Sequence, residues 1–346
     1  MATQSLSSSA MTASVHPRTV GLYRGVLWAA LLTYPLVPVA LYQSRSLAGS
    51  SPWLGLACLV ASYLWSLSGP AAGWLALCEA DRLKLRRRDY PQLAREAILA
   101  WIGAPFYVLS GAVLAWGRLT AYQDAVWYAL LAGVAAARFL PAPESPTSNG
   151  FVLGRLHRAW AVLLLVFAAA HVVNHLFAVD SLAAHVAVQN VLRTVYRQRV
   201  VEVLIVIAAL SQVWTGWKLV SRARQQRTTA MGNLQILAGA FLGMFFCSHL
   251  TGVFISGRLI QHVDTTFAWA TGGPHGLLTN PRSPQFIPYY SLAVLALFVH
   301  AAAAARWTLV PVVGASGAQR ASYAVMVLGA VATALLLLPM AGIHFA

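Results

Sequence analysis

Four histidines of this chain lie inside long apolar segments: His171, His175, His249 and His300. A histidine in the hydrocarbon region of a bilayer is costly, so an intramembrane histidine indicates a functional role by default. Neutral imidazole is a common axial ligand of haem iron, and facing helices of a bundle can supply such ligands. Two of these histidines, on different helices but at one depth, would be able to hold a haem from opposite sides.

The composition indicates an all-helical protein that crosses a membrane several times. Hydrophobic residues make up 59% of the 346 residues and charged residues only 10%, and several apolar stretches exceed 18 residues. The formal net charge of +15 does not indicate nucleic-acid binding, because the basic residues occupy short loops between apolar segments. Cys58, Cys78 and Cys247 have no CxxC spacing, which argues against a disulfide framework, a zinc site or an iron–sulfur site.

We predict about nine membrane spans. They cover residues 22–43, 53–78, 95–117, 124–140, 156–179, 199–220, 233–256, 288–310 and 321–343. The fourth is the weakest, because it is short and runs into a Pro-rich segment; if it does not cross, the first three spans are inverted. Four spans separate the two densest basic segments, 81–90 and 218–227, so both lie on one side, which we expect to be the cytoplasm. The N-terminus is then inside and the C-terminus outside, in the inner membrane of a bacterium.

The sequence divides into four parts. Residues 1–20 form a polar tail, and residues 21–140 form a four-helix membrane region without an intramembrane histidine. The segment 141–150, PAPESPTSNG, is a linker. Residues 151–346 form a five-helix bundle that holds all the intramembrane histidines, and this bundle is the predicted haem-binding part.

Helix geometry places His171 and His249 at the same depth. They lie 15 and 16 residues into their spans, and both spans run outward. At a rise of ~1.5 Å per residue these distances are ~22 and ~24 Å, in the outer half of a core of ~30 Å. His300 lies deeper, at about the level of Gln212. The alternative for each histidine is a hydrogen bond to a neighbouring helix.

The C-terminal five spans match a known family in order and spacing. The matching stretches are RLHRAWAVLLLVFAAAHVVNH (155–175), VEVLIVIAALSQVWTG (201–216), LQILAGAFLGMFFCSH (234–249) and PYYSLAVLALFVH (288–300). They resemble the single-chain, five-helix membrane cytochrome b anchor of succinate:quinone and fumarate:quinone oxidoreductases. In that family the first and third helices of the unit bind an outer haem b, and the second and fourth bind an inner one.

The resemblance implies that His171 and His249 are the ligands of the outer haem and that His300 is one ligand of the inner haem. The second helix departs from the family, because it presents Gln212 where a histidine is expected. We therefore predict one haem b, in the outer half of the membrane.

Two residues near the outer haem have competing roles. His175 lies one turn beyond His171 on the same helix face. Three roles are open to it: it replaces His171 as the haem ligand, it contacts a quinone head group, or it faces water. Glu202 either accepts a proton from quinol or pairs with Arg199 or Arg197.

Basic residues at the inner end of the fifth span form a third candidate group. Arg155 and His157 would contact haem propionates, lipid phosphates or a cytoplasmic partner.

Three functions are compatible with these patterns. The first is electron transfer between a quinone or quinol and a partner protein, with the chain as a non-catalytic or quinone-reactive membrane subunit. A cytoplasmic partner, either a flavoprotein with iron–sulfur clusters or a signalling enzyme, is expected, because the chain has no flavin, nucleotide or iron–sulfur motif. The second is a redox or quinone sensor, since the family's unit is also found fused to signalling domains. The third is a haem-free transporter with a histidine-lined pathway.

Overall fold

The computed structural model describes residues 5–84, 89–139, 150–223 and 228–345, and within these ranges the chain is helical without a β-strand. The predicted all-helical class is confirmed. The longer helices are α1 (Ser5–Thr33), α2 (Leu36–Ser50), α3 (Pro52–Arg82), α4 (Tyr90–Trp116), α5 (Gln123–Ala136), α6 (Gly150–Asp180), α7 (Leu182–Tyr196), α8 (Arg199–Ala223), α9 (Ala230–Leu250) and α11 (Phe286–Met340). A π-helical segment, Thr251–Ile260, continues α9 directly, and α10 (Phe267–Thr271) is short.

Six helices in the described ranges are long and apolar enough to cross a membrane: α3, α4, α6, α8, α9 with its π-helical extension, and α11. They indicate an integral membrane protein. The predicted count of nine spans is not reproduced. α5 has only 14 residues, or ~21 Å, and the first predicted span is broken by a bend of 68° between α1 and α2. Pro35 lies in this bend and cannot donate a backbone hydrogen bond.

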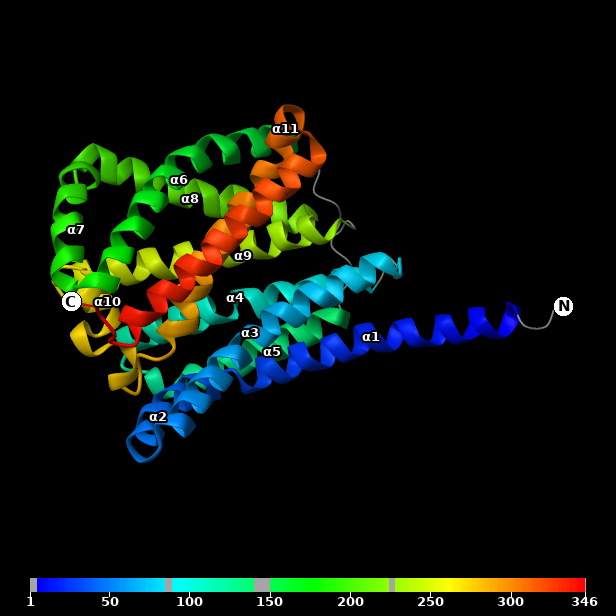
Figure 1. Ribbon diagram of the computed structural model, residues 1–346, viewed down its shortest axis with the longest axis horizontal. Helices are drawn as coiled ribbons and strands as arrows, with labels where there is room; N and C mark the ends of the chain where they lie inside the picture. The colour runs from blue at the N-terminus through cyan, green and yellow to red at the C-terminus, as the bar shows by residue number, and fades with distance from the viewer. Residues whose placement is uncertain (1–4, 85–88, 140–149, 224–227, 346) are drawn as a thin grey trace.

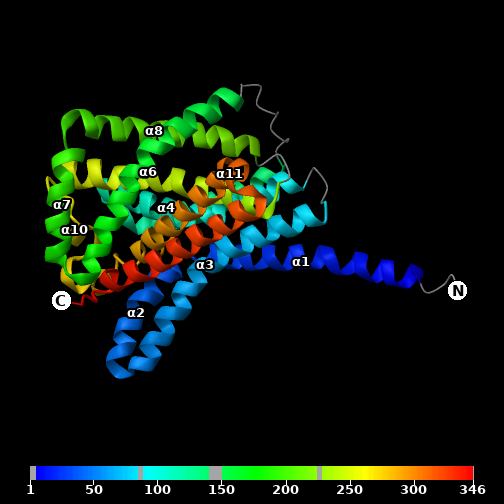
Figure 2. The ribbon, with the colours of Figure 1, turned by 45° about the horizontal axis from the view of Figure 1, so that its top comes forward.

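α11 is a helical hairpin. Its 55 residues are interrupted at Gly314, whose φ of 73° and ψ of 170° are not helical, and the chain turns back there (Figures 1 and 2). The two arms touch closely, because a Cβ on Gly329 would lie 2.4 Å from Cβ of Phe298. The arms correspond to the eighth and ninth predicted spans.

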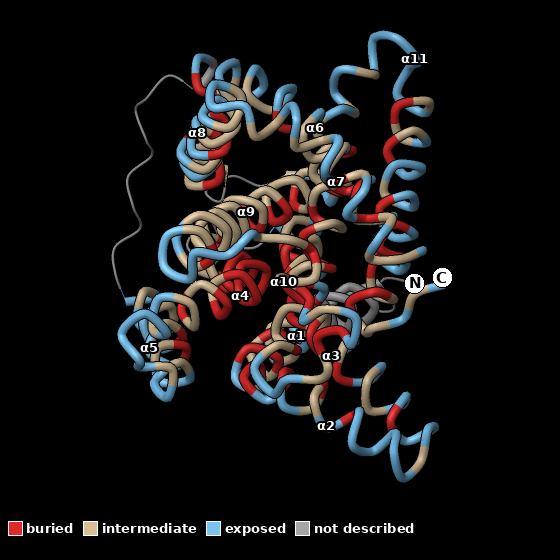
Figure 3. The backbone as a smooth tube through the Cα atoms, turned by 90° about the vertical axis from the view of Figure 1, so that its left-hand side faces the viewer, coloured by how far each residue is buried: buried red, intermediate tan, exposed pale blue. Residues whose placement is uncertain are grey.

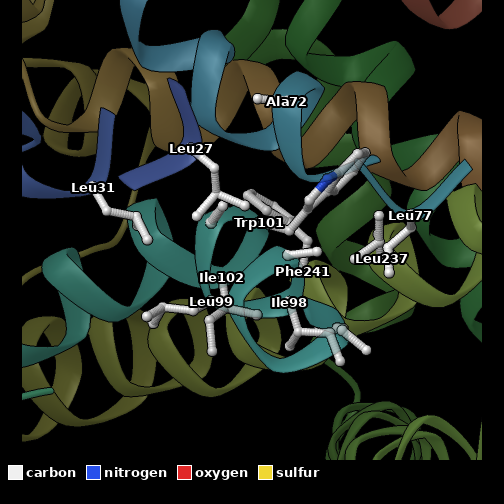
Figure 4. Close-up of a cluster of buried hydrophobic side chains, with 14 of the residues drawn as sticks. Leu27, Leu31, Ala72, Leu77, Ile98, Leu99, Trp101, Ile102, Leu237 and Phe241 are labelled. Carbon is white, nitrogen blue, oxygen red and sulfur yellow. The ribbon is translucent and has the colours of Figure 1, made fainter. Parts of the chain in front are cut away.

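α4 lies at the centre of the molecule. From Ala97 onward α4 has no charged residue, as expected of a helix surrounded by others, and α1, α3, α5, α9 and α11 pack around it. Figure 3 shows α4 as a largely buried helix inside this ring. In the close-up of Figure 4, Trp101 of α4 lies among Leu27 of α1, Leu77 of α3 and Phe241 of α9. The N-terminal and C-terminal parts of the sequence thus share one core.

The end of α3, in the first basic segment, lies beside the start of α9, a few residues after the second basic segment. Nδ2 of Asn233, near the start of α9, donates a hydrogen bond to Oδ2 of Asp81, at the end of α3 (2.7 Å). Membrane sidedness itself remains a prediction. The N- and C-termini lie toward opposite ends (Figure 1).

Three segments close the opposite end of the molecule: α7, residues 261–285 and the C-terminal residues 341–345. We call this end the capped end. α7 begins at an N-cap, since the Ser181 hydroxyl accepts a hydrogen bond from the Ala184 amide (3.1 Å). The C-terminal residues bind the end of α6: Nδ1–H of His344 donates to the Ala178 carbonyl (2.7 Å), and the Phe345 amide donates to the Val179 carbonyl (3.0 Å). Residues 182–196 and 257–287, which lie between predicted spans, are also partly helical: the first forms α7, and the second contains π-helical, α-helical and 3₁₀ turns.

Candidate functional site

A cavity of about 550 Å³ lies between α6, α8, α9 and α11, beneath the capped end. A volume of this size is typical of small-molecule and cofactor sites. Its walls are mainly apolar and aromatic, with Phe167, Phe245 and Tyr289 among them. His171, His175 and His249 also line it, so three of the four histidines singled out in the sequence meet at one site.

His171 of α6 and His249 of α9 face each other in this cavity. Their ring centroids are 6.2 Å apart and their ring planes are inclined by 69°. Each ring is stacked on a phenylalanine one turn earlier in its own helix, His171 on Phe167 (5.5 Å) and His249 on Phe245 (5.1 Å). The structure therefore brings together the two residues that the depth argument matched. We call them the first imidazole pair.

This separation fits a haem iron bound between two imidazoles. Two iron–nitrogen bonds of ~2 Å, plus about 1 Å from each coordinating nitrogen to its ring centre, give roughly 6 Å between ring centres. Among the described residues, no group of three or more His, Cys, Asp or Glu side chains is placed to hold a metal ion.

His175 joins His171 to a histidine that sequence reasoning missed. Nε2 of His175 lies 3.0 Å from Nε2 of His171, and Nδ1 of His175 lies 3.2 Å from Nε2 of His185. His185 belongs to α7 and is fully buried, with Asn174 Nδ2 at 3.1 Å from the same Nε2. The serine N-cap and the amphipathic pattern of residues 182–196 were the signals that could have revealed it.

Burial in the capped end lowers the pKa of His185 to about 4, and the nearby charges of His171 and Arg193 act in the same direction. His185 is therefore neutral near pH 7 and can donate from one ring nitrogen only. Within the described chain, Nδ1 of His185 and Oε1 of Gln189 are buried without a hydrogen-bond partner. Gln189 also lines the cavity, so its carbonyl oxygen is placed to accept a hydrogen bond from a ligand.

Ion pairs surround the cavity at the capped end. Glu202 pairs with Arg258 (2.7 Å), which corrects the expected partners Arg197 and Arg199. Asp264 instead binds Arg193 (2.7 Å) and Arg197 (2.8 Å). Partial burial acts to raise the pKa of Asp264, but the hydrogen bonds from the two guanidinium groups outweigh it and the pKa lies below its usual value.

A second pair of histidines lies at the other end of α6. His157 of α6 and His300 of α11 have ring centroids 6.4 Å apart, with planes inclined by 81°. Gln212 is not directed at His300 as its depth suggested; its amide donates to the backbone carbonyl of His157. Neither His157 nor Arg155 lines the cavity, so the structure does not bring them to the first imidazole pair. We call His157 and His300 the second imidazole pair.

No protein-family model matches the chain, and the comparisons found neither a curated protein nor a solved structure similar to it.

Proposed function

We propose that the chain is a haem b membrane protein that transfers electrons between a quinone or quinol and a partner protein. The observation that carries this proposal is the separation of 6.2 Å between the rings of His171 and His249 at a cavity large enough for a cofactor. The resemblance of residues 155–300 to the cytochrome b anchor of succinate and fumarate oxidoreductases supports the same conclusion.

In this proposal His171 and His249 hold the haem from α6 and α9. The bound haem supplies a one-electron carrier in the apolar interior. Phe167 and Phe245 stack on the two imidazoles and limit the rotation of their rings. Ligation through Nε2 of His171 requires the contact with His175 to open, and His175 then keeps its other contact, to His185.

Glu202 is the carboxylate best placed to accept a proton from a quinol. It lines the same cavity as the first imidazole pair, and its ion pair with Arg258 holds it at the capped end. Gln189 offers a buried carbonyl oxygen to the second hydroxyl of a quinol head group. A quinol in the cavity would therefore find a proton acceptor and a hydrogen-bond acceptor in the same lining as the two histidines.

The sidedness we propose places the capped end outside and the basic end in the cytoplasm of a bacterial cell, with the lipid bilayer around the apolar helices. The chain itself has no flavin or iron–sulfur motif, so a partner protein has to supply or take the electrons. In the proposed sidedness this partner binds at the cytoplasmic end.

Visible spectra of the purified protein test the haem assignment. We expect a b-type α band in the reduced-minus-oxidised spectrum, and we expect His171→Ala and His249→Ala each to lose one equivalent of haem per chain. His275→Ala is the matched control, because His275 is exposed in the segment 261–285. Unchanged haem content in His249→Ala would overturn the assignment. Reduction of the haem by added quinol then tests the electron-transfer role.

A further inference from the structure

We infer that a groove between the α2–α3 hairpin and the capped end binds an anionic phospholipid, with Arg45 holding its phosphate. The hairpin consists of α2 and the first half of α3, residues 36–66, and it projects from the other helices (Figure 2). Residues of its tip and residues from the segments 274–278 and 341–342 line a cavity of about 460 Å³. We call this cavity the hairpin groove. Its volume is typical of a small-ligand site.

The composition of the hairpin indicates that lipid surrounds it. Between residues 34 and 78 the only charged residue is Arg45. Apolar side chains are exposed on both arms, and Val39, Leu54 and Leu64 are each more than half exposed. In a protein with membrane-spanning helices, such a surface faces the hydrocarbon of the bilayer. The hairpin groove therefore lies beside lipid, which is the molecule available to fill it.

The tip of the hairpin lies at the level of the lipid head groups. α2 ends at Ser50 and α3 begins at Pro52, and Ser51 between them is extended (φ −152°, ψ 109°). A break in a helix is not tolerated where it faces hydrocarbon, because its backbone groups need polar partners. Trp53 is 80% exposed, as is typical of an aromatic anchor at the membrane interface. Arg45 lies five residues before the end of α2, or ~7.5 Å along the helix, so its long side chain reaches the same level.

Arg45 is the cation that would bind the phosphate. Its side chain is exposed, and within the described chain it makes no hydrogen bond or ion pair. A guanidinium group can bind two oxygens of one phosphate through parallel N–H bonds. None of the described residues that line the hairpin groove is acidic, so no carboxylate competes with the phosphate. A cationic head group, such as choline, would find no carboxylate there either, and the groove therefore favours an anionic phospholipid.

The rest of the hairpin groove suits the acyl chains of a lipid. Leu56 and Leu59 of α3 and Leu278 of the capped end line it. The two arms of the hairpin are in close contact, because a Cβ on Gly55 would lie 2.5 Å from Cβ of Ala48. Such contacts between small residues fix the spacing of membrane helices. The wall of the groove is thus formed before a lipid binds, which lowers the cost of ordering it.

The position of the hairpin groove gives a bound lipid a structural role. One turn before Arg45, Leu41 of α2 packs in one cluster with Leu277 and Leu336. At the groove itself, a cavity separates the hairpin from the capped end. A lipid bound there would extend the contact between the N-terminal and C-terminal parts of the chain. A ligand that binds only the folded protein stabilises it, so this lipid should raise the stability of the protein.

Lipid titration of the purified full-length protein, followed by native mass spectrometry, tests this inference. We expect one phosphatidylglycerol to bind the parent protein at least about tenfold more tightly than Arg45→Ala, because the substitution removes a charge-assisted hydrogen bond. Arg282→Ala is the matched control and should bind like the parent, since Arg282 is exposed at the capped end but does not line the hairpin groove. Equal affinities of the parent and Arg45→Ala would overturn the assignment.

Two further titrations identify the ligand. Phosphatidylcholine should bind the parent protein more weakly than phosphatidylglycerol, because its head group is cationic. An excess of inorganic phosphate should not displace phosphatidylglycerol, because phosphate lacks the acyl chains that contact the leucines of the groove. Equal binding of both lipids, or displacement by phosphate, would contradict an anionic phospholipid as the ligand.

A second variant and a second measurement separate lipid binding from folding. Leu56→Trp leaves Arg45 in place but fills the apolar part of the hairpin groove, so it should also weaken the binding of phosphatidylglycerol. Added phosphatidylglycerol should raise the thermal unfolding midpoint of the parent and of Arg282→Ala, but not of Arg45→Ala or Leu56→Trp. An equal rise in all four proteins would overturn the assignment. Haem content should be the same in all four, so this test and that of the haem assignment can fail separately.

Discussion

Nε2 of His171 and Nε2 of His175 lie 3.0 Å apart, with ring planes inclined by 72°. The two residues are one helical turn apart on α6, so both compete for the same space beside His249. Only the ring of His171 faces the ring of His249 at 6.2 Å.

The first prediction separates these two histidines as ligands. His175→Ala should retain the haem held at His249, because it removes a contact of His171 without removing the facing imidazole. His171→Ala should lose that haem. The measurement is haem content together with the low-spin electron paramagnetic resonance signal. The opposite pattern, with loss in His175→Ala alone, would make His175 the ligand.

The second prediction concerns Glu202. Glu202→Gln keeps the shape of the side chain but cannot accept a proton, so quinol-driven haem reduction should slow by about 10²-fold, the lower range for general-base catalysis. The haem content should not change, because Glu202 lines the cavity as part of an ion pair with Arg258 and is not one of the proposed haem ligands. Stopped-flow reduction by quinol measures the rate, and reduction by dithionite, which needs no proton acceptor, is the control. A normal quinol rate would leave Glu202 with a structural role only.

The third prediction follows from the buried His185. Its pKa is about 4 in the folded protein against about 6.5 in an unfolded chain. Between these values the unfolded state binds a proton that the folded state does not, so stability falls as the pH is lowered from about 6.5 to about 4. Amide hydrogen exchange in α7 should therefore be faster at pH 5 than at pH 7, after correction for the intrinsic rate. His185→Gln does not titrate and should show a weaker pH dependence; an equal one would contradict the assignment.

The fourth prediction concerns a buried carboxylate in the N-terminal region. Glu96 of α4 is 1% exposed and receives a hydrogen bond from Nε of Arg24 on α1 (2.6 Å). The Arg24 side chain is 43% exposed, so the guanidinium left by Glu96→Ala is only partly enclosed by protein, and the substitution should cost about 1–3 kcal/mol. Glu79→Ala removes an ion pair to the more exposed Arg82 and should cost less than about 1 kcal/mol. Unfolding of the detergent-solubilised protein measures both values, and equal losses would contradict the burial argument.

The helical class and the proximity of His171 and His249 could both be predicted from the sequence. Depth along a helix follows from residue counting, since each residue adds a fixed rise. The direction in which a side chain points around the helix axis depends on packing and does not follow from residue counting. Gln212 was therefore matched with His300 by depth, whereas the structure places His157 opposite the His300 ring.

α7 and α5 show a second limit of sequence reasoning. α7 is amphipathic and lies outside the candidate membrane spans, so a search for apolar runs treats it as a loop and overlooks His185. α5 is apolar but short, and length alone did not decide whether it spans. The bend between α1 and α2 likewise depends on how both helices pack against α3.

The bonds from His344 and Phe345 to the last turn of α6 have a consequence for biosynthesis. The carbonyl groups that end a helix need partners, and here those partners are made 166 residues later in the chain. The last turn of the helix that carries His157 and His171 can therefore acquire these partners only after residues 344 and 345 have been translated, so it completes its hydrogen bonds later than the rest of the helix.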